Sequence, residues 1–390
     1  MEMNNYLTEF IKSKKCTLLG VGPMSTNSID VSVELANEYS IPIFLIASRR
    51  QIDADSFGGG YVNNWSTEEF SAYVQNLDDG NNIILSRDHG GPWQNTKEIE
   101  KHLSLKQAME SAKESYRADI ESGFRKIHID PSIDIHSKPT TDMVLERVFE
   151  LYEYCISEAK RLKKEIIFEI GTEEQSGSTN TQEELDYTLR RMNEFCDKNN
   201  FIRPSFVVIQ SGTRVMEMRN VGSFESPLRV KNELAAEIQV PLMIDICNKY
   251  GIMMKAHNTD YVSNESLQWH PRMGIHAINV APEFGVEETK ELVKVLSENG
   301  LNKILEKFLE ISYNSKKWEK WMLKDTEATD LDRSIISGHY VFSNEEWVEC
   351  RKEAEKKLQK KNIDLNRSLK KAVKFSILRY LVNLRVISAK

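Results

Sequence analysis

The stretch that decides the fold is Ile83-Ile84-Leu85-Ser86-Arg87-Asp88-His89-Gly90-Gly91-Pro92-Trp93. An apolar run ends here in an aspartate and a histidine, and two glycines and a proline follow. This pattern is typical of a buried strand that ends in a tight turn. An unpaired charge is costly in the middle of a strand that is buried on both faces. We therefore expect Asp88 and His89 to lie at the carboxyl end of the strand, where they can reach solvent, a metal ion or a substrate.

Seven further apolar runs end in the same way, with polar residues or a glycine at their carboxyl ends. They are residues 16–23, 42–48, 126–132, 165–173, 206–212, 252–258 and 276–283. A helix or helix-like segment follows each run, so the predicted strands are parallel and joined by crossover connections. Eight such units favour a (β/α)8 TIM barrel. The alternative, a doubly wound sheet, would carry a longer glycine fingerprint than Gly20-Val21-Gly22-Pro23 after its first strand.

We expect the barrel to occupy residues 1–300 and a helical C-terminal extension to occupy residues 301–390. One helix of the extension is predicted to open at Ser343, with Glu346 completing a capping box. The last predicted helix, residues 365–386, combines an apolar stripe with basic side chains. Such a helix can bind an anionic membrane, but we expect its stripe to pack on the barrel or on another subunit.

Composition excludes several classes of protein. Of the 390 residues, 40% are apolar and 28% are charged, with a net charge of −7. From Arg351 to Lys390 there are 13 basic and 3 acidic residues, so the remainder carries −17, which argues against nucleic acid as a partner. No apolar run approaches the ~20 residues of a membrane span, and residues 1–13 do not resemble a secretory signal. The five cysteines show no CxxC spacing, so we expect a cytoplasmic protein without disulfides.

Polar side chains at the carboxyl ends of the strands define the predicted site, because TIM-barrel active sites lie on that face. These residues are Ser48, Asp88, His89, Asp130, Glu173, Gln210, His257 and Asn279. His89 and His257 are the natural pair of metal ligands, since imidazole is a common zinc ligand and a catalytic zinc needs three protein ligands. Glu173 could supply the third ligand and Gln210 a weaker one. Asp130 could bind the metal or orient His89.

Several other residues near the strand ends allow more than one interpretation. Asp88 is a candidate proton shuttle, or it caps the Gly90-Gly91 turn. His128 and His276 fall inside predicted strands, and we expect both to be structural. Arg49, Arg214 and Arg219 follow strand ends and could hold a phosphate, although any one of them is more readily explained as a solvated surface residue.

Several ordered motifs resemble one known family. Residues 87–93, 126–132, 170–173 and 256–261 read RDHGGPW, KIHIDPS, IGTE and AHNTDY. They resemble the patterns GDHLGP, KIHLDAS, IGTE and AHSTDY of the tagatose-bisphosphate aldolase class II accessory-subunit (GatZ/KbaZ-like) family. Residues 57–61, FGGGY, are similar to that family's FGGY, and residues 274–283, GIHAINVAPE, are similar to GIxKxNVATE of the catalytic class II aldolases.

The resemblance implies a (β/α)8 barrel whose relatives include zinc aldolases, ketose C4-epimerases that work by retro-aldol cleavage, and non-catalytic helper subunits. By position it implies that His89 and His257 bind Zn²⁺, with Glu173 near the metal. It also implies that Asp88 exchanges the proton of the C4 hydroxyl and that Asn279 holds the enediolate. The residues that we expect to contact substrate are Ser48, Asp130, Gln210, Arg214 and Asp260.

Two positions depart from the catalytic aldolases. Gln210 stands where they have a histidine, and residues 258–261 stand where they have a glycine-rich phosphate loop. The substrate is therefore expected to be a ketose or a ketose phosphate. Which residues hold its phosphate, if it has one, is left open. We expect a metal-dependent, class II aldolase-like enzyme that cleaves the C3–C4 bond and ends in aldol cleavage or C4 epimerisation. The alternatives are a non-catalytic stabilising subunit of a tagatose-bisphosphate aldolase and a sugar-binding module, so the expected partners include a second aldolase subunit or further copies of the chain.

Overall fold

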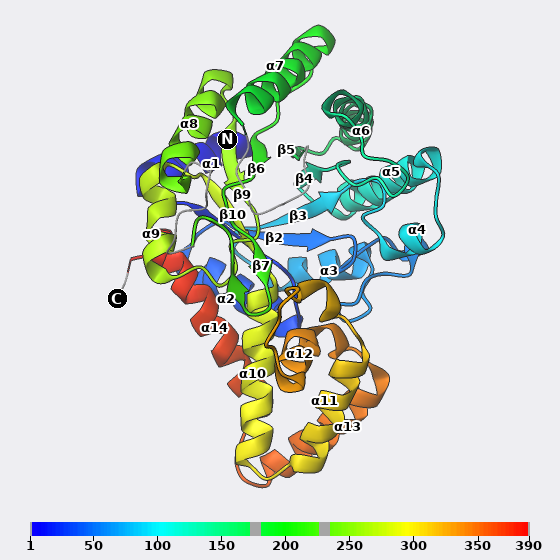
Figure 1. The fold of residues 1–390 in the computed structure, drawn as a ribbon, viewed down its shortest axis with the longest axis vertical. Helices are drawn as coiled ribbons and strands as arrows, with labels where there is room; N and C mark the ends of the chain where they lie inside the picture. The colour runs from blue at the N-terminus through cyan, green and yellow to red at the C-terminus, as the bar shows by residue number, and fades with distance from the viewer. Residues whose placement is uncertain (1, 172–180, 226–234, 389–390) are drawn as a thin grey trace.

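The protein is built around a closed barrel of eight parallel strands, in the order β1-β10-β9-β6-β5-β4-β3-β2 (Figure 1). The computed structural model describes residues 2–171, 181–225 and 235–388. The barrel strands are β1 (Leu18–Val21), β2 (Ile43–Ser48), β3 (Ile83–Gly90), β4 (Lys126–Ile129), β5 (Ile167–Ile170), β6 (Phe206–Ile209), β9 (Met253–Ala256) and β10 (Ala277–Val280). Each of the eight predicted runs contains one of these strands, which confirms the predicted TIM barrel. A short antiparallel hairpin, β7 (Val215–Met216) and β8 (Arg219–Asn220), lies in the connection after β6.

Helices surround the strands on the outside of the barrel. They are α1 (Met3–Lys14), α2 (Thr26–Tyr39), α3 (Thr67–Leu77), α4 (Thr96–Glu100), α5 (Leu105–Ser122), α6 (Thr141–Leu162), α7 (Gln182–Asn199), α8 (Ala236–Tyr250), α9 (Asn264–Met273) and α10 (Pro282–Glu298), with the 3-10 turn η1 (Asp55–Phe57) after β2. Capping boxes at Ser66, Ser104 and Thr181 start α3, α5 and α7. The strands are buried almost from end to end because helices cover them outside and side chains fill the barrel inside.

The C-terminal extension is helical and has a hydrophobic cluster of its own. Its elements are α11 (Asn302–Asn314), η2 (Glu319–Trp321), α12 (Asp330–Ser337), η3 (Gly338–Val341), α13 (Glu345–Gln359) and α14 (Leu365–Asn383). The cluster joins α11 and α13 to the distal half of α10, which runs from the barrel into the extension (Figure 1). The predicted cap at Ser343 is wrong by one residue: Asn344 accepts the hydrogen bond from the Trp347 amide and starts α13.

Helix α14 returns from the extension and packs against the barrel beside α2 and α10 (Figure 1). Its apolar residues Val373, Ile377 and Leu381 belong to the core of the barrel. Its lysines meet acidic residues of α2, since Lys374 Nζ lies 2.5 Å from Glu34 and Lys370 pairs with Asp30. The basic amphipathic helix therefore covers an acidic face of the barrel, as charge complementarity suggested. No helix in the described ranges combines the length and the apolar character that a membrane span needs.

Candidate active site

Polar side chains are stacked in layers inside the barrel toward the carboxyl ends of its strands. Residues two apart on a strand point to the same face. The barrel interior therefore contains, at successive levels toward the carboxyl end of β4, the side chains of Lys126, His128 and Asp130. Lys255 and His257 are arranged in the same way on β9. Below them the rings of Phe44 and Phe206 meet edge to face at 5.9 Å and close the barrel. Along the barrel axis, the interior side chains therefore change from apolar rings to charged groups and then to imidazoles.

A bulge at the end of β3 turns two consecutive side chains toward this interior. Arg87 pairs with Ile127 and Gly90 pairs with Ile129, so β3 has one residue more than β4 between these pairs. His89 adopts a left-handed backbone conformation there, with φ of 44°. On a regular strand Asp88 and His89 would face opposite sides. The bulge brings both of them into the same cluster.

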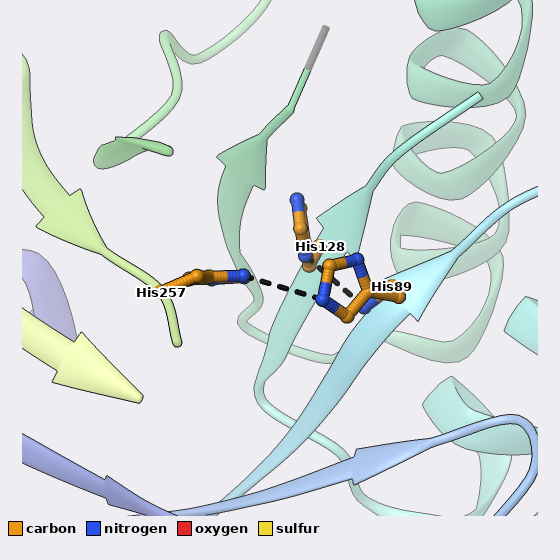
Figure 2. Close-up of side chains that lie close together, drawn as sticks. All are labelled: His89, His128 and His257. Carbon is orange, nitrogen blue, oxygen red and sulfur yellow. Dashed lines mark hydrogen bonds between the residues drawn. The ribbon is translucent and has the colours of Figure 1, made fainter. Parts of the chain in front are cut away.

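Three histidine rings lie around one point (Figure 2). His89 Nδ1 lies 2.7 Å from Asp130 Oδ2, and His89 Nε2 lies 3.3 Å from His257 Nδ1. The backbone amide of His89 donates to His128 Nδ1 at 3.1 Å. The side chain of His89 is 33% exposed, whereas those of His128 and His257 are 1% exposed. The cluster is therefore open to solvent on the side of His89.

Asp88 faces the same point from β3. Its Oδ1 accepts a hydrogen bond from Asn279 Nδ2 at 2.8 Å, and the same oxygen lies 3.8 Å from His257 Nε2. Burial acts to raise the pKa of Asp88, but the charges of His89 and His257 outweigh it and hold that pKa far below its usual range. Burial lowers the pKa of His257 to about 4. A carboxylate, an amide donor and imidazole nitrogens therefore converge on one small volume.

Glu169 lies beneath the rings and is held between two lysines. Its Oε1 lies 3.1 Å from His257 Nε2, and its Oε2 lies 2.9 Å from Lys255 Nζ and also pairs with Lys126. Burial acts to raise the pKa of Glu169, but the two ammonium groups hold it well below the usual value. Burial lowers the pKa of Lys126 to about 7 despite the carboxylate. Glu169 therefore anchors His257 from below as an ionised acceptor.

The side chains present fit a divalent metal ion. Zinc–nitrogen bonds are about 2.0–2.1 Å, so two nitrogens on one tetrahedral zinc lie about 3.4 Å apart. The distance of 3.3 Å between His89 Nε2 and His257 Nδ1 matches this spacing. Ligand atoms of His89, His128 and His257 lie within 4.8 Å of one another, as do those of Asp88, His128, Glu169 and His257. In the described part of the chain, the buried Nε2 of His128 has no hydrogen-bond partner.

A comparison with known protein families matches most of the chain. The family described as "D-tagatose-1,6-bisphosphate aldolase subunit GatZ/KbaZ-like" matches residues 3–366. The chain belongs to the GatZ/KbaZ-like family. The match covers the whole barrel and most of the extension, so this family assignment includes both parts.

Solved structures share the fold of this GatZ/KbaZ-like chain at low identity. A probable tagatose 6 phosphate kinase from Sinorhizobium meliloti 1021 superposes with a TM-score of 0.75 at 18% identity, covering 94% of this chain and 100% of the other. The fructose-bisphosphate aldolase of Campylobacter jejuni gives 0.55 at 13% identity over 99% and 96%. The fructuronate-tagaturonate epimerase UxaE of Cohnella laeviribosi gives 0.56 at 11% identity over 95% and 81%. At these identities the likeness concerns the fold alone.

The other predicted residues of the GatZ/KbaZ-like chain lie at different distances from the cluster. Ser48 is opposite Asp88 in the sheet register, and its hydroxyl donates to Gln51 Oε1 at 2.9 Å. Gln210 is buried directly after β6, whereas the side chain of Arg214 is exposed before the β7–β8 hairpin. Glu173 lies outside the described residues.

Asp260 is buried beside the start of α10. Its Oδ1 accepts hydrogen bonds from the backbone amides of Ala281 and Glu283, both at 2.9 Å. Burial, assisted by the Glu283 carboxylate, raises the pKa of Asp260 to about 7. Asp260 therefore connects the loop after His257 to the helix after Asn279.

The structure contradicts both predictions for Arg49, that it holds a phosphate and that it is a solvated surface residue. Its guanidinium is buried and donates to Asp53 at 2.9 Å and to Glu98 at 2.6 Å. These bonds tie the loop after β2 to α4, and they leave the side chain no access to a ligand.

Two members of the cluster were not expected from the sequence. The position of His128 inside a strand predicts a structural role, and no sequence pattern singles out Glu169. The signal for His128 was the spacing itself: if Asp130 lines the interior, so does the residue two positions before it. His276, by contrast, lies outside the cluster, and its Nδ1 accepts the Met254 amide at 3.1 Å.

Proposed function

We propose that the protein is a metal-dependent, class II aldolase-like enzyme that acts on a ketose or ketose phosphate. It breaks the C3–C4 bond by retro-aldol chemistry and ends in either aldol cleavage or C4 epimerisation. The observation that carries this proposal is the convergence of Asp88, Asn279, His89 and His257 on one solvent-open point at the carboxyl ends of the strands.

Zn²⁺ is the proposed metal, and its ligands are His89 and His257. The third ligand is Glu173, which the family resemblance implies lies near the metal, or His128, which the described cluster offers. Asp130 orients the His89 ring through Nδ1, which directs Nε2 toward His257. Polarisation of the ketose carbonyl is the chemistry that a bound divalent metal supplies.

The residues of the chain carry the proton and hold the charge. Asp88 accepts the proton of the C4 hydroxyl while the C3–C4 bond breaks. The bonding electrons move into the C2–C3 enediolate, and C4 becomes the carbon of an aldehyde. Asn279 Nδ2 donates a hydrogen bond to the enediolate. If the aldehyde turns over and adds again, Asp88 returns the proton to the new C4 hydroxyl; if it leaves, C3 is protonated instead. Ser48, Gln210, Arg214 and Asp260 are proposed to contact the substrate or to shape its pocket.

The test combines metal content with turnover. Purified protein is analysed for zinc and incubated with fructose 6-phosphate, tagatose 6-phosphate, tagatose 1,6-bisphosphate and their unphosphorylated ketoses. We expect release of an aldehyde or formation of the C4 epimer, abolished by chelator and by His89→Ala. Asp88→Asn should lose about 10²–10⁴-fold in kcat while retaining its metal. A wild-type protein that binds zinc but leaves every ketose unchanged would contradict the proposal.

A second function is supported by the family description, which names an aldolase subunit. In that case the chain stabilises a separate catalytic aldolase and does no chemistry itself. The same preparation tests this, because a helper subunit would be inactive alone and would raise the activity or half-life of a partner class II aldolase.

A further inference from the structure

Two cations, Arg50 and Lys320, lie in segments around the carboxyl ends of the barrel strands. Arg50 lies two residues beyond Ser48, which is opposite Asp88 in the sheet register. Lys320 comes from the turn η2 of the C-terminal extension. Both side chains are exposed. Arg50 is linked to Lys320 through two rings: the Tyr61 amide donates to the Arg50 carbonyl at 3.1 Å, and the Tyr61 ring lies 4.8 Å from the ring of Tyr340, which Lys320 contacts. The barrel and the extension therefore each contribute one cation to the same rim.

Contacts on both sides hold this part of the extension against the rim. The Glu217 amide, at the β7–β8 hairpin, donates to the Trp321 carbonyl at 2.7 Å, and the Thr326 hydroxyl donates to Glu217 Oε1 at 2.5 Å. On the other side the ring of Tyr340, in η3, lies 4.8 Å from the ring of Tyr61, which follows β2. The segment 319–341 thus bridges two loops that surround the carboxyl ends of the strands.

The ammonium group of Lys320 is positioned by aromatic rings, and no carboxylate among the described residues pairs with it. Its Nζ lies 4.5 Å from the ring centre of Trp321 and 5.5 Å from that of Tyr340, distances typical of cation–π contacts. Within the ranges that the structure describes, neither Lys320 nor the Arg50 guanidinium has a salt bridge or side-chain hydrogen bond. Other cations near the cluster differ, since Arg49, Lys126 and Lys255 all pair with carboxylates.

Two neighbouring cations without a counterion repel each other, and a bound anion relieves that repulsion. A guanidinium offers a planar fork that matches phosphate or carboxylate oxygens, and an ammonium adds a point charge. This combination recognises an anionic oxygen group.

We propose that Arg50 and Lys320 form a subsite for the anionic end, a phosphate or a carboxylate, of a sugar whose reacting carbons lie at the Asp88–His89 cluster. The proposal rests on the proposed function and names its substrate class: an acyclic sugar with a terminal anion, in place of a neutral ketose. It also gives the extension a direct part in substrate binding, because Lys320 is absent from the barrel itself.

The test compares binding of neutral and anionic sugars. Fluorescence of Trp321, which contacts Lys320, reports binding of inorganic phosphate, fructose, fructose 6-phosphate and fructuronate to the intact protein, and Trp321→Phe assigns the signal. In Arg50→Gln and in Lys320→Met we expect the Kd of the anionic sugar to rise at least about tenfold, with the Kd of fructose unchanged. Lys320→Arg should recover most of the loss. Lys307→Met, at an extension lysine that pairs with Glu346, serves as the control and should bind as wild type.

The outcomes separate this subsite from the proposed function. Tighter binding of fructose 6-phosphate or of fructuronate than of fructose, lost in both variants, supports the subsite, and the tighter of the two identifies the anion. Equal binding of all three sugars, or an equal loss for fructose in the variants, overturns it. Charge-dependent binding without any turnover leaves the subsite standing and removes the retro-aldol function. Turnover of neutral and anionic ketoses that neither variant affects supports the retro-aldol function and overturns the subsite.

Discussion

At the scale of single residues, His128 is one of the two candidates for the third ligand of the proposed metal ion. We expect His128→Asn to lower the affinity for zinc at least about tenfold. An asparagine oxygen can still accept the His89 amide, so the variant removes the buried Nε2 and keeps the backbone contact. His276→Asn is the matched control, because it removes a ring outside the cluster and can keep the bond from the Met254 amide. Metal titration of both proteins is the measurement; undiminished affinity in His128→Asn would leave Glu173 as the third ligand.

Asp260 should make the stability of the protein depend on pH. Its carboxyl has a pKa of about 7 in the folded protein and about 3.9 in an unfolded chain. Between these values the folded state binds a proton that the unfolded state does not, so the free energy of unfolding falls as pH rises from 4 to 7. Asp260→Asn can still accept both amides and should flatten this slope, by about 2–4 kcal/mol across the range. Urea unfolding at a series of pH values measures it, and an unchanged slope would contradict the assignment.

Most of the site could be read from residue positions, and the exceptions have a physical reason. The sequence predicts that His89, Asp130, His257 and Asn279 lie together, because polar residues at the carboxyl ends of parallel strands share one face of the barrel. The sequence predicts a structural role for His128 because strand interiors usually hold structural residues, whereas the interior of this barrel is polar near its mouth. Arg49 pairs with Asp53 and Glu98. Such partners depend on contacts between distant segments, which no local sequence pattern encodes.

At the scale of elements, the end of β3 is the feature on which the site depends. The bulge that brings Asp88 and His89 together passes directly into Gly91. A β-carbon on Gly91 would lie 2.4 Å from the carbonyl oxygen of Asp130, which is backbone and cannot move aside cheaply. The apolar run predicted the strand and the glycines predicted a turn, but a bulge is a property of pairing with β4 and could not be seen in one segment alone.

Gly91→Ala should therefore disrupt both stability and the site. We expect a loss of about 2–4 kcal/mol in the free energy of unfolding and reduced zinc binding, because Asp130 would move and no longer orient His89. Gly300→Ala is the control for backbone strain: Gly300 has φ of 69° with open space around it, so it should cost only about 1–2 kcal/mol and leave zinc binding intact. Chemical denaturation and metal titration decide between them, and equal effects of the two variants would show that crowding at Asp130 is unimportant.

At the scale of the whole molecule, the extension is tied to the barrel along two surfaces. Helix α14 contributes side chains to the core of the barrel, and the segment 319–341 rests on the rim near the cluster. Tyr380 of α14 also donates to Glu283 and to the Thr259 carbonyl, close to His257 and Asn279. Composition predicted a helical C-terminal segment whose positive charge complements the acidic barrel. How deeply this segment packs depends on which helix faces meet the barrel, and composition does not specify that.

Barrel and extension should consequently unfold together. Ile377 of α14 is fully buried, and truncation to alanine should lower the free energy of unfolding by about 2–5 kcal/mol. Phe375, two residues earlier and 62% exposed, is the control, and Phe375→Ala should change stability by less than about 0.5 kcal/mol. Thermal unfolding followed at once by circular dichroism and by release of zinc should give one transition in every variant, shifted down only for Ile377→Ala. Two separate transitions, with the zinc-linked one unmoved by Ile377→Ala, would mean that the barrel holds its site without the extension.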